Sequence, residues 1–154
     1  MKDIVLCDID GTVAACEWRT PYKQQGWDAY HAAAEHDEHN EDVVNLLHVL
    51  ARDYCVVGLT SRPEKFRQMT VRWLVAHGVP MHAVLMRPND CYLPSPQSKL
   101  AVVRERFGEE WYKRVLFMID DRQDVVIAFV EAGLTGFLIY PGRRLYVQKP
   151  TTDP

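Results

Sequence analysis

Short, unbroken hydrophobic runs alternate along the chain with longer segments in which hydrophobic residues recur every three or four positions. Unbroken runs are typical of strands buried on both faces, whereas the longer spacing is typical of helices that cover a sheet. The pattern predicts strands at residues 4–7, 54–59, 81–86, 115–119 and 135–140. Because these strands alternate with helices, we expect an α/β fold with helices on both faces of a mainly parallel five-stranded sheet.

Helix signals fill the intervals between the predicted strands. Asn40 is a good N-cap before an amphipathic stretch, and Pro63 suits the first turn of a helix that ends at Gly78. Further helices are expected at residues 27–35, 98–107 and 124–132. The segment from Gly11 to Asn40 is too short for a sizeable cap domain, so a ligand site at the carboxyl ends of the strands should be comparatively open.

A chain of 154 residues, 47% of them hydrophobic, is long enough for one complete domain. We expect that domain at residues 1–141 and a basic, proline-containing tail at residues 142–154. The net charge of −3 provides no overall attraction to nucleic acid, so such a partner must be bound by a local patch. The four cysteines have no metal-ligand spacing. The first residues lack the hydrophobic length of a signal peptide or membrane span, which predicts a cytoplasmic protein that binds no membrane.

Acidic residues end two of the predicted strands. Asp8 and Asp10 follow the first hydrophobic run, and Asp120 and Asp121 follow the fourth. Two carboxylates at the end of a buried strand repel each other and resist desolvation unless a cation lies between them. Carboxylate oxygens suit a hard cation, so the sequence predicts a magnesium site formed by these two strand ends.

Four short motifs occur in order between Lys2 and Tyr140. They are Asp8-Ile9-Asp10-Gly11-Thr12, Leu59-Thr60-Ser61-Arg62, Lys99, and Ile119-Asp120-Asp121-Arg122 with Asp124. This set resembles the four motifs of the haloacid dehalogenase (HAD) superfamily. The resemblance implies a three-layer Rossmann-like fold in which the cap is reduced to a flap.

A closer resemblance is to the 3′-phosphatase domain of phage-type polynucleotide kinase/phosphatase. The similarity includes Arg19 with Pro21-Tyr22, Trp27-Asp28, Arg62-Pro63-Glu64, Leu85-Met86-Arg87 and the residues from Asp120 to Val126. The chain departs from that family in two ways. It has Ser95 and prolines where an acidic residue tends to precede the motif-three lysine, and it contains no kinase domain with a glycine-rich nucleotide loop.

The resemblance implies roles for the charged residues of the motifs. Asp8 would attack phosphorus and form an aspartyl-phosphate, and Asp10 would act as general acid and then as general base. Mg²⁺ would be held by Asp8, the Asp10 carbonyl and Asp121, with Asp120 either a direct ligand or a support. Lys99 would neutralise the charge of the transition state.

The resemblance also implies a set of phosphate-binding residues. Thr60 or Ser61 would offer a hydroxyl and a backbone N–H at a helix N-terminus. Arg19 and Arg62 would each grip phosphate through two N–H groups. Gly11, within the first motif, completes this set.

Three further groups each have two interpretations. Asp124 either caps the helix that follows it or orients the motif-three lysine. Trp18, Tyr22 and Trp27 either stack on a nucleobase at the entrance or belong to the core. The histidines and acids at residues 31–39 suggest either a metal site or a polar, solvated helix end. The solvated helix end is favoured because no apolar shell or second ligand group accompanies them.

These observations lead to one leading hypothesis of function and two alternatives. The first is a Mg²⁺-dependent phosphomonoesterase that removes 3′-terminal phosphates from nucleic acid or nucleotides through an aspartyl-phosphate, as in end healing. The second is a nucleoside monophosphate phosphatase of the 5′-nucleotidase kind. The third, of a different class, is a non-catalytic module that binds phosphorylated ends. Self-association and a separate kinase or ligase partner are compatible with all three.

Overall fold

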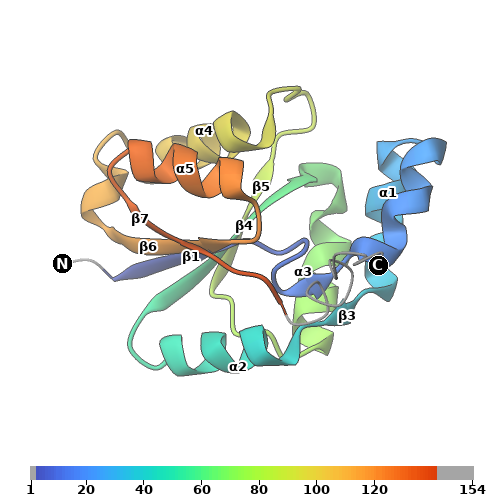
Figure 1. Cartoon of the computed structure of the whole chain (residues 1–154), viewed down its shortest axis with the longest axis horizontal. Coiled ribbons are helices and arrows are strands. Elements are labelled where there is room, and N and C mark those ends of the chain that lie inside the picture. The colour runs from blue at the N-terminus through green and yellow to red at the C-terminus, as the bar shows by residue number, and fades with distance from the viewer. Residues whose placement is uncertain (1–2, 142–154) are drawn as a thin grey trace, which may run out of the picture.

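The computed structural model describes residues 3–141, and the predicted tail at residues 142–154 lies outside them. A five-stranded sheet forms the centre, with the strand order β5-β4-β1-β6-β7 and every neighbouring pair parallel (Figure 1). Its strands are β1 Ile4–Cys7, β4 Cys55–Pro63, β5 Ala83–Arg87, β6 Val115–Asp120 and β7 Thr135–Leu138. The hydrophobic runs therefore predicted the strands correctly.

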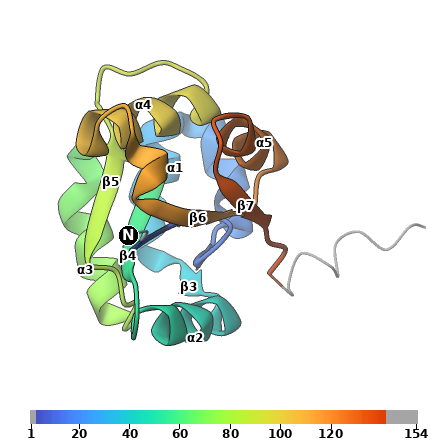
Figure 2. The same ribbon diagram turned by 90° about the vertical axis from the view of Figure 1, so that its left-hand side faces the viewer.

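Two pairs of helices cover the sheet and make the three layers that were predicted (Figures 1 and 2). On one face lie α2 Glu41–Leu50 and α3 Arg67–Ala76, and on the other lie α4 Ser95–Phe107 and α5 Gln123–Glu131. None of the described helices is long and apolar enough to cross a membrane.

Each face of the sheet has its own hydrophobic core, because successive side chains of a strand point to opposite faces. On the α4–α5 side, Leu6 packs in a cluster with Trp111 and Phe129. On the α2–α3 side, Cys7 packs in a second cluster with Leu47. Burial on both faces explains why the central strand reads as an unbroken apolar run.

The insertion between β1 and α2 is mainly helical, and part of it corresponds to the helix predicted at residues 27–35. Two very short strands, β2 Ala14–Ala15 and β3 Glu38–His39, pair antiparallel at its base. Between them the chain is helical, as η1 Glu17–Gln25, α1 Trp27–Ala32 and η2 Ala33–His36. The sequence of η1 lacks the alternation that a longer strand needs, and it includes a proline. We call residues 14–39 the flap.

Two helix starts differ from the prediction. Pro63 ends β4 instead of opening a helix: its φ of −61° and ψ of 148° are extended, and it pairs with Arg87 beyond a register shift. The helix α3 begins only at Arg67, after the short turn η3 Glu64–Phe66. The helix α4 starts three positions earlier than expected, at Ser95, because a proline is well accommodated in a first helical turn.

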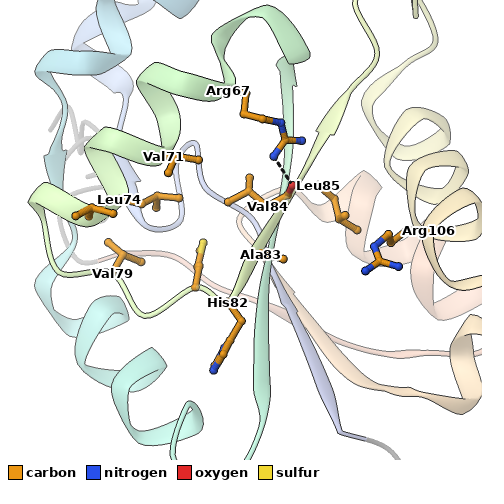
Figure 3. Close-up of a pocket in the computed structure, with 11 residues that line it drawn as sticks. Arg67, Val71, Leu74, Val79, His82, Ala83, Val84, Leu85 and Arg106 are labelled. Carbon is orange, nitrogen blue, oxygen red and sulfur yellow. Dashed lines mark hydrogen bonds between the residues drawn. The ribbon is translucent and has the colours of Figure 1, made fainter.

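A groove of about 470 Å³ follows the open edge of β5 (Figure 3). Valine, leucine and methionine side chains from α3 and the following loop line it, and Arg67 and Arg106 lie along its rim (Figure 3). Arg67 donates a hydrogen bond of 3.0 Å to the Val84 carbonyl, which occupies one acceptor of this edge strand. None of the residues predicted for the active site lines this groove.

Candidate active site

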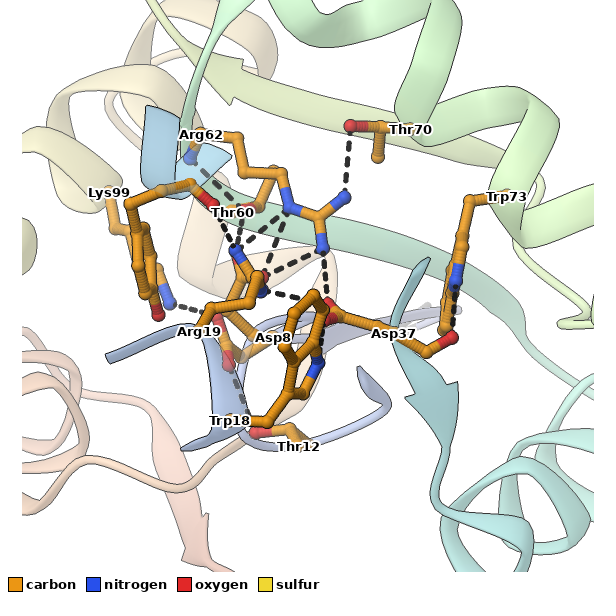
Figure 4. A network of polar contacts seen from close by, with 12 residues as sticks. Asp8, Thr12, Trp18, Arg19, Asp37, Thr60, Arg62, Thr70, Trp73 and Lys99 are labelled. Atoms are coloured by element: carbon orange, nitrogen blue, oxygen red, sulfur yellow. Dashed lines mark hydrogen bonds and ion pairs between the residues drawn. The ribbon is translucent and has the colours of Figure 1, made fainter. Parts of the chain in front are cut away.

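The predicted site residues come together where β1, β4 and β6 end (Figure 4). Asp8 follows β1, Thr60 lies in β4, and Asp120 is the last residue of β6. The backbone N–H of Asp8 donates to the Ile119 carbonyl at 2.9 Å, so the ends of β1 and β6 are held side by side. Neighbouring parallel strands therefore place their carboxylates at one edge of the sheet, as the sequence predicted.

Asp8, Asp120 and Asp121 form a buried acidic cluster, with one carboxylate oxygen of each within 4.8 Å of the others. The Nζ of Lys99 donates to Asp8 Oδ1 at 2.5 Å and to Asp120 Oδ2 at 2.7 Å. Burial, reinforced by the negative charge of Asp120, raises the pKa of Asp8 well above its usual range, although Lys99 opposes this effect. Burial works against the charged form of Lys99, but Asp8 and Asp120 outweigh it and raise the lysine's pKa.

The donor set of the acidic cluster fits a hard divalent cation. Three buried carboxylates lie close together and the ammonium group of Lys99 bonds two of them, which leaves negative charge that burial makes costly. Carboxylate oxygens are the ligands that Mg²⁺ prefers. Asp8, Asp120 and Asp121 are the side chains that would hold it, whereas the carboxylate of Asp10 lies outside the cluster.

Lys99 is oriented by Asp120, and the interpretation in which Asp124 orients it is wrong. Lys99 is 2% exposed on α4, and the side chains it contacts are those of Asp8 and Asp120. Asp124 instead faces solvent, where it pairs with Arg122, and its Oδ1 accepts the backbone N–H of Val125 at 3.0 Å. Asp124 lies in the first turn of α5, after the N-cap Arg122, and α5 has no side-chain capping bond, so Asp124 is not the N-cap either.

Asp10 is held by two arginines, Arg19 and Arg62. The Nε of Arg62 donates to both Asp10 oxygens, at 3.1 and 2.9 Å, and its Nη2 donates to Oδ1 at 2.7 Å. Arg19 adds a further bond to Oδ1, and the Thr60 hydroxyl donates to Oδ2 at 3.3 Å. Burial alone would raise the pKa of Asp10, but Arg62 and Arg19 outweigh it and hold that pKa far below its usual range.

Asp37 completes this network, and its assignment to a solvated helix end is wrong. The residue is 2% exposed, and its Oδ2 accepts a bond of 2.8 Å from Arg19 while its Oδ1 accepts the Trp18 indole N–H at 2.9 Å. Its backbone carbonyl accepts the Trp73 indole N–H at 2.9 Å. Burial raises the pKa of Asp37 to about 6, against Arg19 and Arg62, which lower it.

Sequence reasoning missed Asp37 because its partners lie far along the chain in a segment without periodicity. The need for a second carboxylate follows only from the structure, in which two fully buried arginines share Asp10. Thr12 was missed as well. Its hydroxyl donates to Asp8 Oδ2 at 3.0 Å, while Lys99 bonds the other oxygen, Oδ1.

The residues predicted to bind phosphate are arranged differently from the expectation. Thr60 and Ser61 lie within β4 and not at a helix N-terminus, because that strand continues to Pro63. The Ser61 and Ser95 hydroxyls are hydrogen-bonded at 2.6 Å, which ties β4 to the start of α4. Gly11 makes the turn after Asp10 with a φ of 85°, which favours glycine.

Arg19 and Arg62 grip a carboxylate in the structure and not an open phosphate site. Both side chains are 0% exposed, and Arg62 makes with Asp10 the two-pronged contact that was expected for phosphate. Arg19 bonds Asp10 and Asp37 through Nη2 and donates to the Tyr30 carbonyl through Nη1. Two guanidinium groups buried against Asp10 and Asp37 form a charge-balanced unit.

The three aromatic residues that were predicted to stack lie on the surface of the flap. Trp18, Tyr22 and Trp27 are 42%, 36% and 61% exposed, so the interpretation that they belong to the core is wrong. Trp18 packs edge-on against Tyr22, and the Nζ of Lys23 lies 5.4 Å from the centre of the Trp27 ring. Nucleobase stacking on these rings stays a prediction.

Comparison with solved structures finds likeness over nearly the whole chain. The structure of the Pnkp1/Rnl/Hen1 complex matches with a TM-score of 0.73 and 29% identity, over 90% of this chain and 46% of that one. A structure of the Pnkp1/Rnl/Hen1 RNA repair complex matches with a TM-score of 0.75 and 27% identity, over 90% and 42%. The chain thus spans less than half of the chains it matches there.

A more distant structure shows the fold alone. It is the HAD family enzyme bt-2542 from Bacteroides thetaiotaomicron, in complex with magnesium and inorganic phosphate, with a TM-score of 0.58 and 13% identity. The match covers 92% of this chain and 96% of that one. No curated protein sequence matches the chain significantly.

Residues 2–143 match the sequence family of the polynucleotide kinase PNKP phosphatase domain, a HAD family. That match covers nearly the whole chain and agrees with the fold, with the order of the four motifs and with the meeting of Asp8, Lys99 and Asp120 at one sheet edge. The chain belongs to the PNKP phosphatase domain family and is a HAD-type phosphatase.

Proposed function

We propose that this chain is a Mg²⁺-dependent phosphomonoesterase that removes 3′-terminal phosphates from nucleic acid ends through an aspartyl-phosphate. The observation that carries the proposal is the position of Asp8. One of its oxygens faces Lys99 and the other is fixed by Thr12, at the edge of the acidic cluster. A carboxylate held in this way is oriented for attack on a phosphorus atom.

The reaction proceeds in two displacements. An oxygen of Asp8 attacks phosphorus, and the P–O bond to the substrate's 3′-oxygen breaks. That oxygen takes a proton from Asp10, which carries one only once the negative charge of the bound phosphate offsets Arg62 and Arg19, because the two arginines hold the pKa of Asp10 far below its usual range. A water molecule then attacks phosphorus, Asp10 takes the water's proton, and the Asp8–phosphorus bond breaks to release inorganic phosphate. Lys99 lies against Asp8 and stabilises the negative charge that accumulates in both displacements.

Mg²⁺, held by Asp8, Asp120 and Asp121 with the Asp10 carbonyl, would supply positive charge that lets two anions approach each other. Lys99, together with the charge that the ion would bring, would then offset the negative charge of the phosphoryl group. Lys99 and Asp120 already form a hydrogen-bonded pair, so this part of the site is organised in advance.

Arg19 and Arg62 are positioning residues for Asp10 in this proposal. Because both are fully buried and both bond the Asp10 carboxylate, they hold the proton donor and acceptor in one orientation. Asp37 in turn holds Arg19 from the flap side. Thr60 supports the second oxygen of Asp10.

Nucleic acid is favoured as the substrate by the flap and by the relatives. Exposed Trp18, Tyr22 and Trp27 offer surfaces on which bases stack, and Trp18 is linked to the site through Asp37. The related Pnkp1 chains belong to an RNA repair complex with Rnl and Hen1, which supports end healing beside a separate ligase.

Phosphate release from matched substrates tests the proposal. The substrates are a 3′-phosphorylated oligonucleotide, its 5′-phosphorylated counterpart, and 3′- and 5′-mononucleotides, each with Mg²⁺ and with a chelator. We expect the 3′-phosphorylated oligonucleotide to be preferred and the chelator to abolish turnover. Preference for a 5′-mononucleotide would replace the substrate assignment with that of a nucleoside monophosphate phosphatase.

Asp8→Asn tests the nucleophile. The substitution keeps the size of the side chain but removes the attacking oxygen, so turnover should fall by about a thousandfold or more. Asp53→Asn, in an exposed turn before β4, is the control and should leave turnover unchanged. Circular dichroism checks that both variants fold. An Asp8→Asn protein with full activity would exclude the aspartyl-phosphate, and a wild type that binds phosphorylated ends without turnover would be a binding module.

A further inference from the structure

A pair of histidines lies outside the acidic cluster, between the flap and α3. His39, on β3, and His77, just after α3, have their Nδ1 atoms 3.0 Å apart. Both residues are half-buried. His77 therefore provides a second ligand group for the polar segment at residues 31–39. The sequence of that segment does not show it, because His77 lies at the end of α3, 38 positions after His39.

The pair also has an aromatic shell. The Trp73 ring lies against His77, with ring centres 4.4 Å apart and planes inclined by 33°. The indole N–H of Trp73 donates to the Asp37 carbonyl, so this shell is joined to the residue that holds Arg19.

The separation of the two nitrogens suits a shared metal ion. Bonds from imidazole nitrogen to first-row metals are about 2.0–2.1 Å long, so two nitrogens 3.0 Å apart subtend an angle of about 90° at the ion. That angle is the one between adjacent ligands in the square-planar or octahedral geometries of Cu²⁺ and Ni²⁺, and imidazole is a preferred ligand for both.

We propose that His39 and His77 form a second metal site, which takes a divalent transition-metal ion such as Ni²⁺ or Cu²⁺ and completes its shell with water. Its nitrogen ligands separate it chemically from the all-oxygen acidic cluster at Asp8. A metal ion there joins β3 to the end of α3 and so restrains the flap next to Asp37.

Calorimetric titration of Ni²⁺ into the untagged full chain tests the site. Excess Mg²⁺ is present throughout. Because Mg²⁺ prefers oxygen ligands, it saturates the acidic cluster and leaves the imidazole groups free. We expect one Ni²⁺ per chain for the wild type. His39→Gln and His77→Gln should each weaken binding at least about tenfold, because each removes one of two protein ligands. His36→Gln, an exposed histidine of the same segment, should bind Ni²⁺ as the wild type does.

Cu²⁺ electron paramagnetic resonance provides a second measurement that needs no folded variant. In the wild type, with Mg²⁺ in excess, the spectrum should carry hyperfine coupling to two imidazole nitrogens at one Cu²⁺ per chain. Equal Ni²⁺ affinity in the wild type and both histidine variants would overturn the proposal, as would a Cu²⁺ spectrum without paired imidazole coupling. In either case the two rings are joined by a hydrogen bond only. Phosphatase activity enters neither readout, so the result is independent of the proposed function.

Discussion

At the scale of single residues, the main feature of the site is that its arginines bond carboxylates of the same chain. Arg62 contacts both oxygens of Asp10, and Arg19 lies between Asp10 and Asp37. The sequence motif predicted phosphate contacts for both arginines, but their complete burial favours a positioning role. The two roles make different kinetic predictions.

The substitution Arg62→Lys distinguishes the positioning role of this arginine from a phosphate-binding role. Lysine keeps the charge but loses the planar fork, so Asp10 should be poorly oriented as a proton donor. We expect kcat on a 3′-phosphorylated oligonucleotide to fall about tenfold or more with little change in KM. An aryl phosphate with an acidic leaving group needs less protonation, so its kcat should fall much less.

The matched control is Arg67→Lys, because Arg67 also contacts both oxygens of a carboxylate, that of Glu64, on the rim of the β5 groove. This variant should leave kcat and KM unchanged for both substrates. A rise in KM for both substrates with Arg62→Lys would instead mean that Arg62 binds the substrate phosphate, as the sequence motif predicted.

At the scale of elements, the flap presents an aromatic surface and the sheet depends on close contacts with its helices. Trp27 is the most exposed of the three flap aromatics that were predicted to stack, at 61%. Gly136 of β7 lies so near α5 that a Cβ added there would be 2.8 Å from Val126 Cγ1. One feature bears on substrate binding and the other on stability.

Trp27→Ala tests whether the flap binds nucleobases. Stacking of one base on an aromatic side chain contributes about 1–3 kcal/mol, so KM for the 3′-phosphorylated oligonucleotide should rise about fivefold or more. KM for an aryl phosphate should stay the same. Tyr112→Ala is the control, since Tyr112 is 38% exposed in the turn before β6, at the opposite end of the sheet from the site. Equal KM for the oligonucleotide in wild type and Trp27→Ala would exclude stacking on this ring.

Gly136→Ala tests the contact between β7 and α5. The obstacle is a methyl group of a β-branched side chain in a packed helix, so the substitution should destabilise the fold by about 1–3 kcal/mol. At Gly58 the nearest atom to an added Cβ is Met81 Sδ at 2.7 Å, which belongs to a flexible side chain that can move aside. Gly58→Ala should therefore cost less than about 1 kcal/mol, and urea unfolding of both variants measures the difference.

At the scale of the whole molecule, stability in acid depends on a buried histidine of the flap. His31 is 5% exposed and packs against Trp27, Tyr30 and Phe66. Burial lowers the pKa of His31 from 6.5 to about 4. The folded state therefore favours the neutral imidazole, whereas the unfolded chain binds a proton there below pH 6.5.

The sign of the effect follows from this difference. The contribution of His31 to stability is complete above pH 6.5 and is lost as the pH falls towards 4, because only the unfolded chain takes up the proton in that window. Relative to His31→Phe, the wild type should lose on the order of 2–3 kcal/mol of unfolding free energy between neutral pH and pH 4. Urea unfolding of both proteins at several pH values measures it, and parallel pH curves would contradict the expectation.

The sequence by itself determined the architecture and the acidic strand ends. Burial of a parallel strand on both faces requires an unbroken apolar run, and such runs marked β1 and β6 before Asp8 and Asp120. The order of the motifs likewise singled out Lys99. These features depend on residues that are close in sequence, or on strand ends that parallel pairing brings to one edge.

Only the tertiary structure decided which side chains are partners. Arg62 reaches Asp10 across 52 positions, Arg19 reaches Asp37 across 18, and His39 meets His77 across 38. The chain between these partners has no common period, so no local pattern reports their distance. A charged side chain that is removed from water is stable only beside an opposite charge. The packing of the flap against β4 and α3 determines which charged side chains become partners.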